Sequence, residues 1–140
     1  MLIVSLPSGN QLSFLWVKDG GSAMMNATNI SLSALSAFRK KLDVTANNIA
    51  NTLTDQFKKS RVTMEEASPN GVKAVVDRVE TQGLPKESII DGESVTVESS
   101  NVDLSEELPE LAVTRTAYGA NLKTLKTQND MLGSLLDIFS

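Results

Sequence analysis

Residues 101–140 read NVDLSEELPELAVTRTAYGANLKTLKTQNDMLGSLLDIFS, and the rest of the chain is organised around this stretch. Apolar or bulky side chains recur in it at alternating steps of four and three, once the polar Arg115 and Asn129 are included. A seven-residue repeat is typical of a seam between supercoiled helices. A helix of about 38 residues would be about 57 Å long, so its stripe needs a partner. The apolar members are Leu104, Leu108, Leu111, Tyr118, Leu122, Leu125, Leu132, Leu136 and Phe139.

The start of this helix has two candidate caps. Asn101 is one, and Asp103 followed by Glu106 is an acidic variant of a capping box. Acidic residues gather in the first turns, where the helix dipole favours them. Pro109 lacks an N–H and clashes with the preceding turn, so we expect either a kink or a helix start near Leu108.

Composition excludes several classes of function. The 140 residues include no cysteine and no histidine, which removes thiolate chemistry, the usual zinc sites and the commonest general base. A net charge of −4 argues against nucleic acid. Aromatic residues make up only 4% of the chain, which favours long helices with thin seams over a thick core. We therefore expect no catalytic, cofactor-binding or metal-binding residues, no small-molecule substrate and no transmembrane segment.

Residues 1–23 differ in character from the rest of the chain. Two short apolar runs, Leu2–Val4 and Leu12–Val17, flank the turn pair Gly9-Asn10. One interpretation is a β-hairpin, and the other is a leader added by a misplaced start, with the true start at Met24 or Met25. No positive charge precedes the first run, so a cleaved secretory signal is a poor match.

A second amphipathic helix is predicted from Ser31 to about Asn51, with Ser31 or Ser33 as its cap. Its stripe steps by three and four, as the last helix does. Three asparagines crowd its end, and they indicate either a frayed terminus or a polar cluster that bonds to a neighbouring chain. The stripe is Leu35, Phe38, Leu42, Thr45 and Ile49, and the asparagines are Asn47, Asn48 and Asn51.

The middle of the chain predicts about three short strands. One begins near Val62 and Met64, the second covers Val72–Val79, and the third covers Glu93–Glu98. Thr81–Lys86 contains glycine and proline and is expected to be a loop. A sheet this small cannot bury much alone, so it should lean on the helices.

The predicted fold is mainly α, with two long terminal amphipathic helices that pair, parallel or antiparallel, as a coiled-coil-like unit around a small β segment. The expected divisions are 1–23, 24–60, 61–100 and 101–140. Two helices bury one face each, and the apolar residues left on other faces favour further association over a self-contained hairpin.

Two motifs resemble those of the bacterial flagellar rod, hook and axial protein family. Ala46-Asn47-Asn48-Ile49-Ala50-Asn51 is similar to the end of that family's N-terminal helix, and Phe57-Lys58 is similar to the aromatic-lysine step that comes after it. Residues 101–108 look like the start of the family's C-terminal helix, and residues 115–121 resemble its Arg-Ala-Tyr-Glu-Ala-Asn step. The resemblance covers roughly residues 26–57 and 101–139.

Three positions depart from the family pattern. Gln56 stands where the loop usually has a glycine, Gly119 replaces an acidic residue, and Pro109 interrupts a helix that is otherwise unbroken. The middle segment is very short, so the chain looks most like a proximal-rod subunit.

The resemblance implies a structural subunit of the basal-body rod, the periplasm-spanning shaft of the flagellum, that assembles itself through its terminal helices. Its partners would be other copies, other rod and axial subunits, and the flagellar export apparatus, which passes the unfolded chain without a cleaved signal. The residues expected at the assembly interface are Leu35, Phe38, Leu42, Asn48, Ile49, Asn51, Leu111, Tyr118, Leu122, Leu125, Leu132 and Leu136.

A rival hypothesis is a soluble helical binding module, such as a chaperone or adaptor of a secretion system. Such a module would fold as a stable dimer and would not polymerise. The two hypotheses differ in whether the terminal helices are ordered in the isolated monomer.

Overall fold

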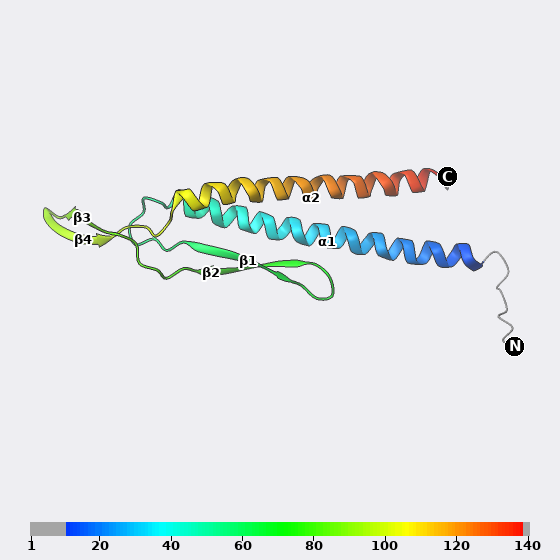
Figure 1. Cartoon of the computed structure of the whole chain (residues 1–140), viewed down its shortest axis with the longest axis horizontal. Coiled ribbons are helices and arrows are strands. Elements are labelled where there is room, and N and C mark those ends of the chain that lie inside the picture. Colours follow the sequence, from blue (N-terminus) through cyan, green and yellow to red (C-terminus); the bar gives the residue numbers. More distant parts are fainter. Residues whose placement is uncertain (1–10, 139–140) are drawn as a thin grey trace.

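The computed structural model describes the backbone of residues 11–138 and the side chains of residues 26–138. Two long helices run side by side in opposite directions, α1 over Gln11–Ala50 and α2 over Leu104–Ile138 (Figure 1). The segment between them forms strands, and it lies toward the end where α1 finishes and α2 begins. The predicted arrangement of two long helices around a small β region is therefore present, and the pairing is antiparallel.

Helix α1 begins earlier than the sequence predicts. Leu12–Val17 lies inside it, so the interpretation of that run as a hairpin strand is wrong, and Leu2–Val4 falls outside the described residues. Ser31 and Ser33 do not cap the helix, because their hydroxyls donate to the carbonyls of Ala27 and Ile30 in the preceding turn. Such bonds return a serine hydroxyl to its own helix, so the serines do not end it.

Helix α2 begins at Leu104, and Asp103 is its N-cap. The Asp103 carboxylate accepts from the N–H of Ser105 at 2.8 Å, while its carbonyl accepts from the N–H groups of Glu106 and Glu107. The Ser105 side chain and backbone hold the pKa of Asp103 below its usual value of 3.8. A helix start near Leu108 is therefore wrong, and Pro109 lies inside one continuous helix (Figure 1).

Four strands form two antiparallel hairpins, where the sequence predicts about three strands. β1 (Ser60–Glu66) pairs with β2 (Val72–Arg78), and β3 (Pro85–Ile90) pairs with β4 (Glu93–Glu98). The missed strand is β3, which starts inside the predicted loop. Its proline is the first residue of the strand, opposite Glu98, a position where proline is tolerated.

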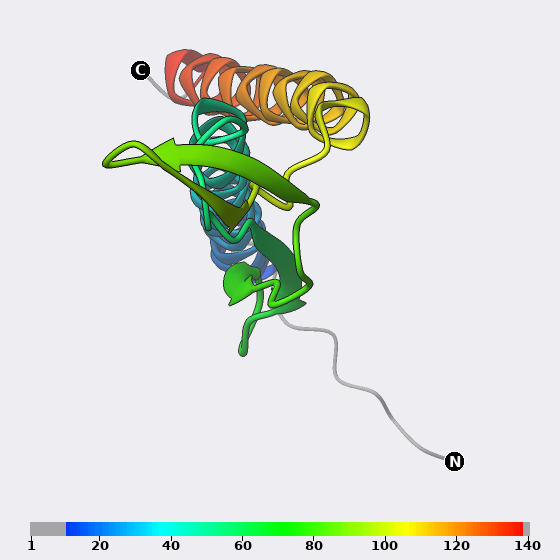
Figure 2. The ribbon, with the colours of Figure 1, turned by 90° about the vertical axis from the view of Figure 1, so that its left-hand side faces the viewer.

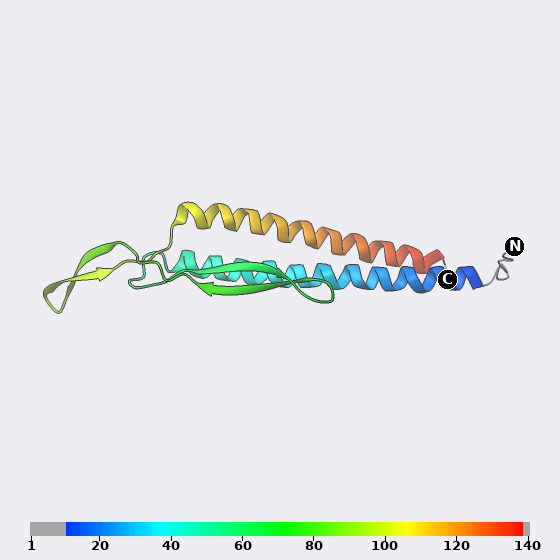
Figure 3. The same ribbon diagram turned by 60° about the horizontal axis from the view of Figure 1, so that its bottom comes forward.

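The two hairpins have different surroundings. The β1–β2 hairpin packs along α1, which therefore lies between α2 and this hairpin (Figures 1 and 2). The β3–β4 hairpin projects beyond the ends of the helices (Figure 3) and, within the described residues, packs against neither helix nor the other hairpin.

The interior of the folded chain is thin and largely polar. Among the described side chains, only Leu35 and Ala37 are apolar and buried. Burying little apolar area gives little hydrophobic stabilisation, so specific polar contacts carry much of the packing. The buried polar residues are Ser31, Thr45, Asn48, Glu107 and Thr114.

Candidate assembly surface

Asn48, near the end of α1, is 2% exposed and joins three elements. Its amide nitrogen donates to the carbonyl of Ser60 at 2.8 Å, and its side-chain oxygen accepts from the Ser60 N–H at 3.0 Å. The same nitrogen donates to the Glu107 carboxylate of α2 at 3.1 Å. The Asn48 side chain thus pairs with the Ser60 backbone as a neighbouring strand would. It also holds the start of α2 next to α1 and β1. We call this polar contact between α1, β1 and α2 the junction.

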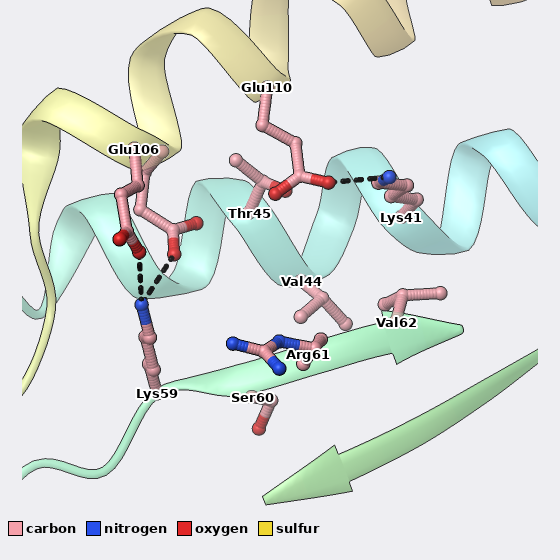
Figure 4. A pocket seen from close by; sticks show the side chains of 10 residues that line it. Lys41, Val44, Thr45, Lys59, Ser60, Arg61, Val62, Glu106 and Glu110 are labelled. Atoms are coloured by element: carbon pink, nitrogen blue, oxygen red, sulfur yellow. Dashed lines mark hydrogen bonds and ion pairs between the residues drawn. The ribbon is translucent and has the colours of Figure 1, made fainter. Parts of the chain in front are cut away.

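Lysine side chains extend the junction. The Lys59 ammonium lies 2.8 Å from Glu106 and 3.9 Å from the buried Glu107, and Lys41 pairs with Glu110 at 2.5 Å (Figure 4). A buried carboxylate is costly unless it is paired and hydrogen-bonded, and Asn48 and Lys59 supply both. The small pocket that these residues line also includes Arg61.

Asn101, directly before α2, ties the strand segment to the junction. Its side-chain oxygen accepts from the Lys59 N–H at 2.6 Å, and its nitrogen donates to the carbonyls of Val79 and Thr81, each at 2.9 Å. Its own N–H donates to the Phe57 carbonyl at 3.3 Å. The asparagine therefore fixes the entry to α2, while Asp103 caps the helix.

The loop after α1 anchors the β3–β4 hairpin. The Lys58 ammonium pairs with the Glu98 carboxylate of β4, and the N–H of Gly83 donates to the same carboxylate. These two donors, Lys58 first, hold the pKa of Glu98 below its usual value of 4.5. Gln56 in this loop has a φ of 61°, a left-handed conformation that favours glycine. It is the position where the family resemblance expects a glycine.

One face of α2 packs toward α1. Glu107 reaches Asn48 at one end of this face, and Gln128 exchanges hydrogen bonds of 3.4 Å with Thr28 and Ser31 farther along. Buried or half-buried side chains recur along it at alternating steps of four and three, which keeps the predicted seven-residue period. They are Glu107, Leu111, Thr114, Tyr118, Asn121, Leu125, Gln128 and Leu132.

Half of the predicted stripe is not on this face. From Leu111, Tyr118 and Leu125 the predicted repeat continues by steps of four, to Arg115, Leu122 and Asn129. The packed face continues instead by steps of three, to the polar residues Thr114, Asn121 and Gln128. Four leucines therefore form an exposed row beside the packed face, which we call the α2 stripe. They are Leu104, Leu108, Leu122 and Leu136, with exposed fractions of 40, 52, 44 and 71%.

The residues predicted at the assembly interface divide into three groups. Leu122 and Leu136 are exposed on the α2 stripe, whereas Leu35 and Asn48 are buried within the chain. Asn51 directly follows α1, where its side chain donates to the Asn47 carbonyl and accepts from the Thr54 hydroxyl. The half-buried remainder are Phe38, Leu42, Ile49, Leu111, Tyr118, Leu125 and Leu132.

Sequence reasoning selected Asn48 but missed the buried polar residues of α2. Glu107 and Thr114 lie one position before the leucine and the arginine that the apolar repeat selects. Counting apolar residues alone cannot find them. Asn101 is predicted only as a candidate cap, although its place between Phe57-Lys58 and α2 indicates a link between the two motifs.

The described residues hold no group of three acidic, histidine or cysteine side chains that could bind a metal ion. Within residues 11–138, neither helix has an apolar stretch suited to crossing a lipid bilayer.

Comparison with known protein families matches both helical regions. Residues 29–58 match the family described as flagella basal body rod protein, and residues 94–138 match the flagellar basal body rod FlgEFG protein C-terminal family. Together the two matches cover more than half of the sequence, in the order and at the positions of α1 and α2. The chain belongs to the flagellar rod and hook protein family. A comparison with curated proteins gives no significant match.

Family membership identifies the chain as a structural component of the flagellar basal body, concerned with motility. The matched regions include both helical residues of the junction, Asn48 in the first match and Glu107 in the second. The matched families are structural and not enzymatic. The resemblance that the sequence motifs predict is therefore confirmed.

Proposed function

We propose that this rod-family protein assembles with further copies of itself and with other rod subunits through its terminal helices, as part of the periplasmic drive shaft. Its place among the rod subunits is proposed to be proximal, because the segment between the two helices is short. The unfolded chain would enter through the flagellar export apparatus without a cleaved signal.

The observation that carries this proposal is the α2 stripe. This chain leaves four leucines at 40–71% exposure on one side of a single helix. Large apolar side chains that recur along one side of a helix without a partner in their own chain favour an interaction site. The packed face of α2, which is half apolar and half polar, lies against α1 within the chain, so the leucines beside it are left for a neighbour.

In this proposal the junction acts within one chain, and the α2 stripe acts between chains. Asn48 and Glu107 hold the two helices and β1 together within one chain, so the subunit presents α1 and α2 in a fixed relation. The role of Asn48 and Asn51 in bonds between chains stays a prediction. A soluble dimer would cover the same leucines once, whereas a rod subunit repeats its contacts around a helical tube.

The test is swimming in a strain that lacks the gene and carries a plasmid copy. We expect the unaltered chain to restore swimming and filaments, and Leu122→Asp to fail, because a carboxylate would enter an apolar contact. Thr127→Asp introduces the same charge at an exposed position on another side of α2, and it should restore swimming. Normal swimming without the gene, or with Leu122→Asp, would contradict the proposal.

A further inference from the structure

The β3–β4 hairpin forms an arm with an apolar tip. The arm projects past the helices (Figures 1 and 3) and, within the described residues, packs against no other helix or strand outside its own pair. At its far end Ile89 is 79% exposed, Ile90 49% and Val95 41%. A two-stranded hairpin is marginally stable alone, so apolar side chains exposed on it call for a partner.

The arm tip also carries negative charge that the chain does not neutralise. Glu87, Asp91 and Glu93 make no ion pair with any described residue. The charged groups nearer the base of the arm are paired, Lys86 with Asp55 and Glu98 with Lys58. The unpaired charge is therefore acidic and confined to the part that projects.

The middle of α2 has the opposite character. Leu122 of the α2 stripe is 44% exposed, and Arg115, Lys123 and Lys126 lie within seven residues of it. None of these cations forms an ion pair within the part of the chain that the structure describes, although Lys41, Lys58 and Lys59 near the junction all do. The surface around Leu122 is thus apolar and positively charged, and the arm tip is apolar and negatively charged. The two surfaces complement each other.

One copy of the chain cannot bring these surfaces together. Leu122 lies eighteen residues along α2 from Leu104, about 27 Å at 1.5 Å per residue. The arm extends from the start of α2 in the opposite direction (Figure 1). The tip therefore points away from the helical surface that matches it, and the match must be made between molecules.

We propose that the arm tip of one copy docks onto α2 of a second copy, around Leu122. This inference rests on the proposed function and names one of its contacts. Two different surfaces meet, so each copy can offer its own arm onward, and such heterologous contacts build open helical assemblies. Ile89, the more exposed isoleucine, supplies the buried apolar area, because Ile90 points to the other face of the hairpin. The charges fix orientation more than affinity.

The chain has no cysteine, so single introduced cysteines can test this contact. Two differently tagged copies, Ile89→Cys and Leu122→Cys, would be expressed together in the strain that lacks the gene, and isolated basal bodies would be oxidised mildly. We expect a disulfide-linked dimer that carries both tags. The matched control pairs Ile89→Cys with Thr127→Cys, on another side of α2, and should give several-fold less.

Charge reversal sharpens the test. Glu87 lies on the same face of the hairpin as Ile89. Glu87→Lys in the Ile89→Cys copy should therefore lower the yield of mixed dimer several-fold, and Lys126→Glu in the Leu122→Cys copy should restore it. A mixed dimer no more abundant than the Thr127→Cys control, or Leu122→Cys linked only to itself, would overturn arm docking and leave helix assembly standing. A tagged unaltered chain that is absent from basal bodies would contradict the proposed function as well.

Discussion

The two ends of the helix pair are held in different ways. At the junction, α1, α2 and β1 are joined by short bonds of 2.8–3.1 Å through one buried asparagine, with ion pairs around it. Farther along, Gln128 meets Thr28 and Ser31 at 3.4 Å, and leucines of the α2 stripe remain exposed beside the contact.

This difference separates the folding of one subunit from its assembly with others. The junction uses polar groups whose geometry specifies one arrangement, and these groups are satisfied within the chain. The α2 stripe, which runs from Leu104 beside the junction to Leu136, has apolar side chains that one chain does not cover. The junction therefore defines the subunit, and the α2 stripe is available to define the assembly.

The largest expected effect is at the junction itself. Asn48→Ala would leave the Ser60 N–H and carbonyl and the Glu107 carboxylate without this partner, and each lost bond to a buried group costs about 1–3 kcal/mol. We expect a loss of about 3 kcal/mol in the free energy of unfolding by urea. Asn47→Ala removes the same side chain from an exposed neighbouring position and should change little. Equal stability of the two variants would refute the role given to the junction.

Two glycines, one at the base of the arm and one in α2, have different surroundings. A Cβ on Gly83, at the base of the arm, would lie 2.0 Å from the Ser99 carbonyl oxygen, whereas a Cβ on Gly119 in α2 meets nothing within 4 Å. Overpacking typically costs about 1–3 kcal/mol, so Gly83→Ala should destabilise the chain. Gly119→Ala should stabilise it by about 0.5–1 kcal/mol, because alanine is the better helix former. Thermal unfolding of both variants gives the two signs, and a stabilising Gly83→Ala would be incompatible with the close approach.

A smaller gain is expected at the loop between α1 and β1. Gln56 has a φ of 61°, which costs a residue with a side chain about 1 kcal/mol relative to glycine. Gln56→Gly should therefore raise stability, by less than about 1 kcal/mol after the added flexibility of the unfolded chain is counted. Gln82→Gly, in another exposed segment, is the control. A Gln56→Gly variant less stable than the parent chain would show that the glutamine side chain compensates for its backbone.

The smallest effect concerns pH. The pKa of Glu98 is held below 4.5 by Lys58 and Gly83, so the ionised carboxylate favours the folded chain above that pH. Because a depressed pKa stabilises above the unfolded value, this contribution is lost as pH falls from 4.5 through the lowered pKa. Glu98→Gln should flatten that part of the pH dependence of thermal unfolding, and Glu87→Gln at the projecting arm tip should not. Identical profiles for both variants would argue against the Lys58 pair.

The sequence predicts much of the fold because its signals are long. The seven-residue period of residues 101–140 and the asparagine-rich motif at residues 46–51 are spread over many residues, and both helices and the family can be predicted from them. The β segment is harder to predict, because β3 starts at a proline. Its pairing with β4 depends on cross-strand contacts, which the β propensity of single residues does not predict.

The candidate surface could be predicted only in part, for a physical reason. Leucines recur at both the three-step and four-step positions around a helix, and the apolar repeat alone does not distinguish those that a single chain buries. The structure shows polar Glu107 and Thr114 buried beside Leu111, while Leu108 and Leu122 stay exposed. That choice depends on Asn48, Lys59 and Ser60, which are far away in sequence.

The most direct test of the central claim is whether the α2 stripe is needed for entry into the basal body. Basal bodies would be purified from cells that carry Leu122→Asp or Thr127→Asp as the sole copy, and the incorporated chain would be quantified by immunoblot against the amount in whole cells. We predict that Thr127→Asp is incorporated like the unaltered chain, while Leu122→Asp accumulates in cells and is absent from basal bodies. Equal incorporation of both variants would contradict the account.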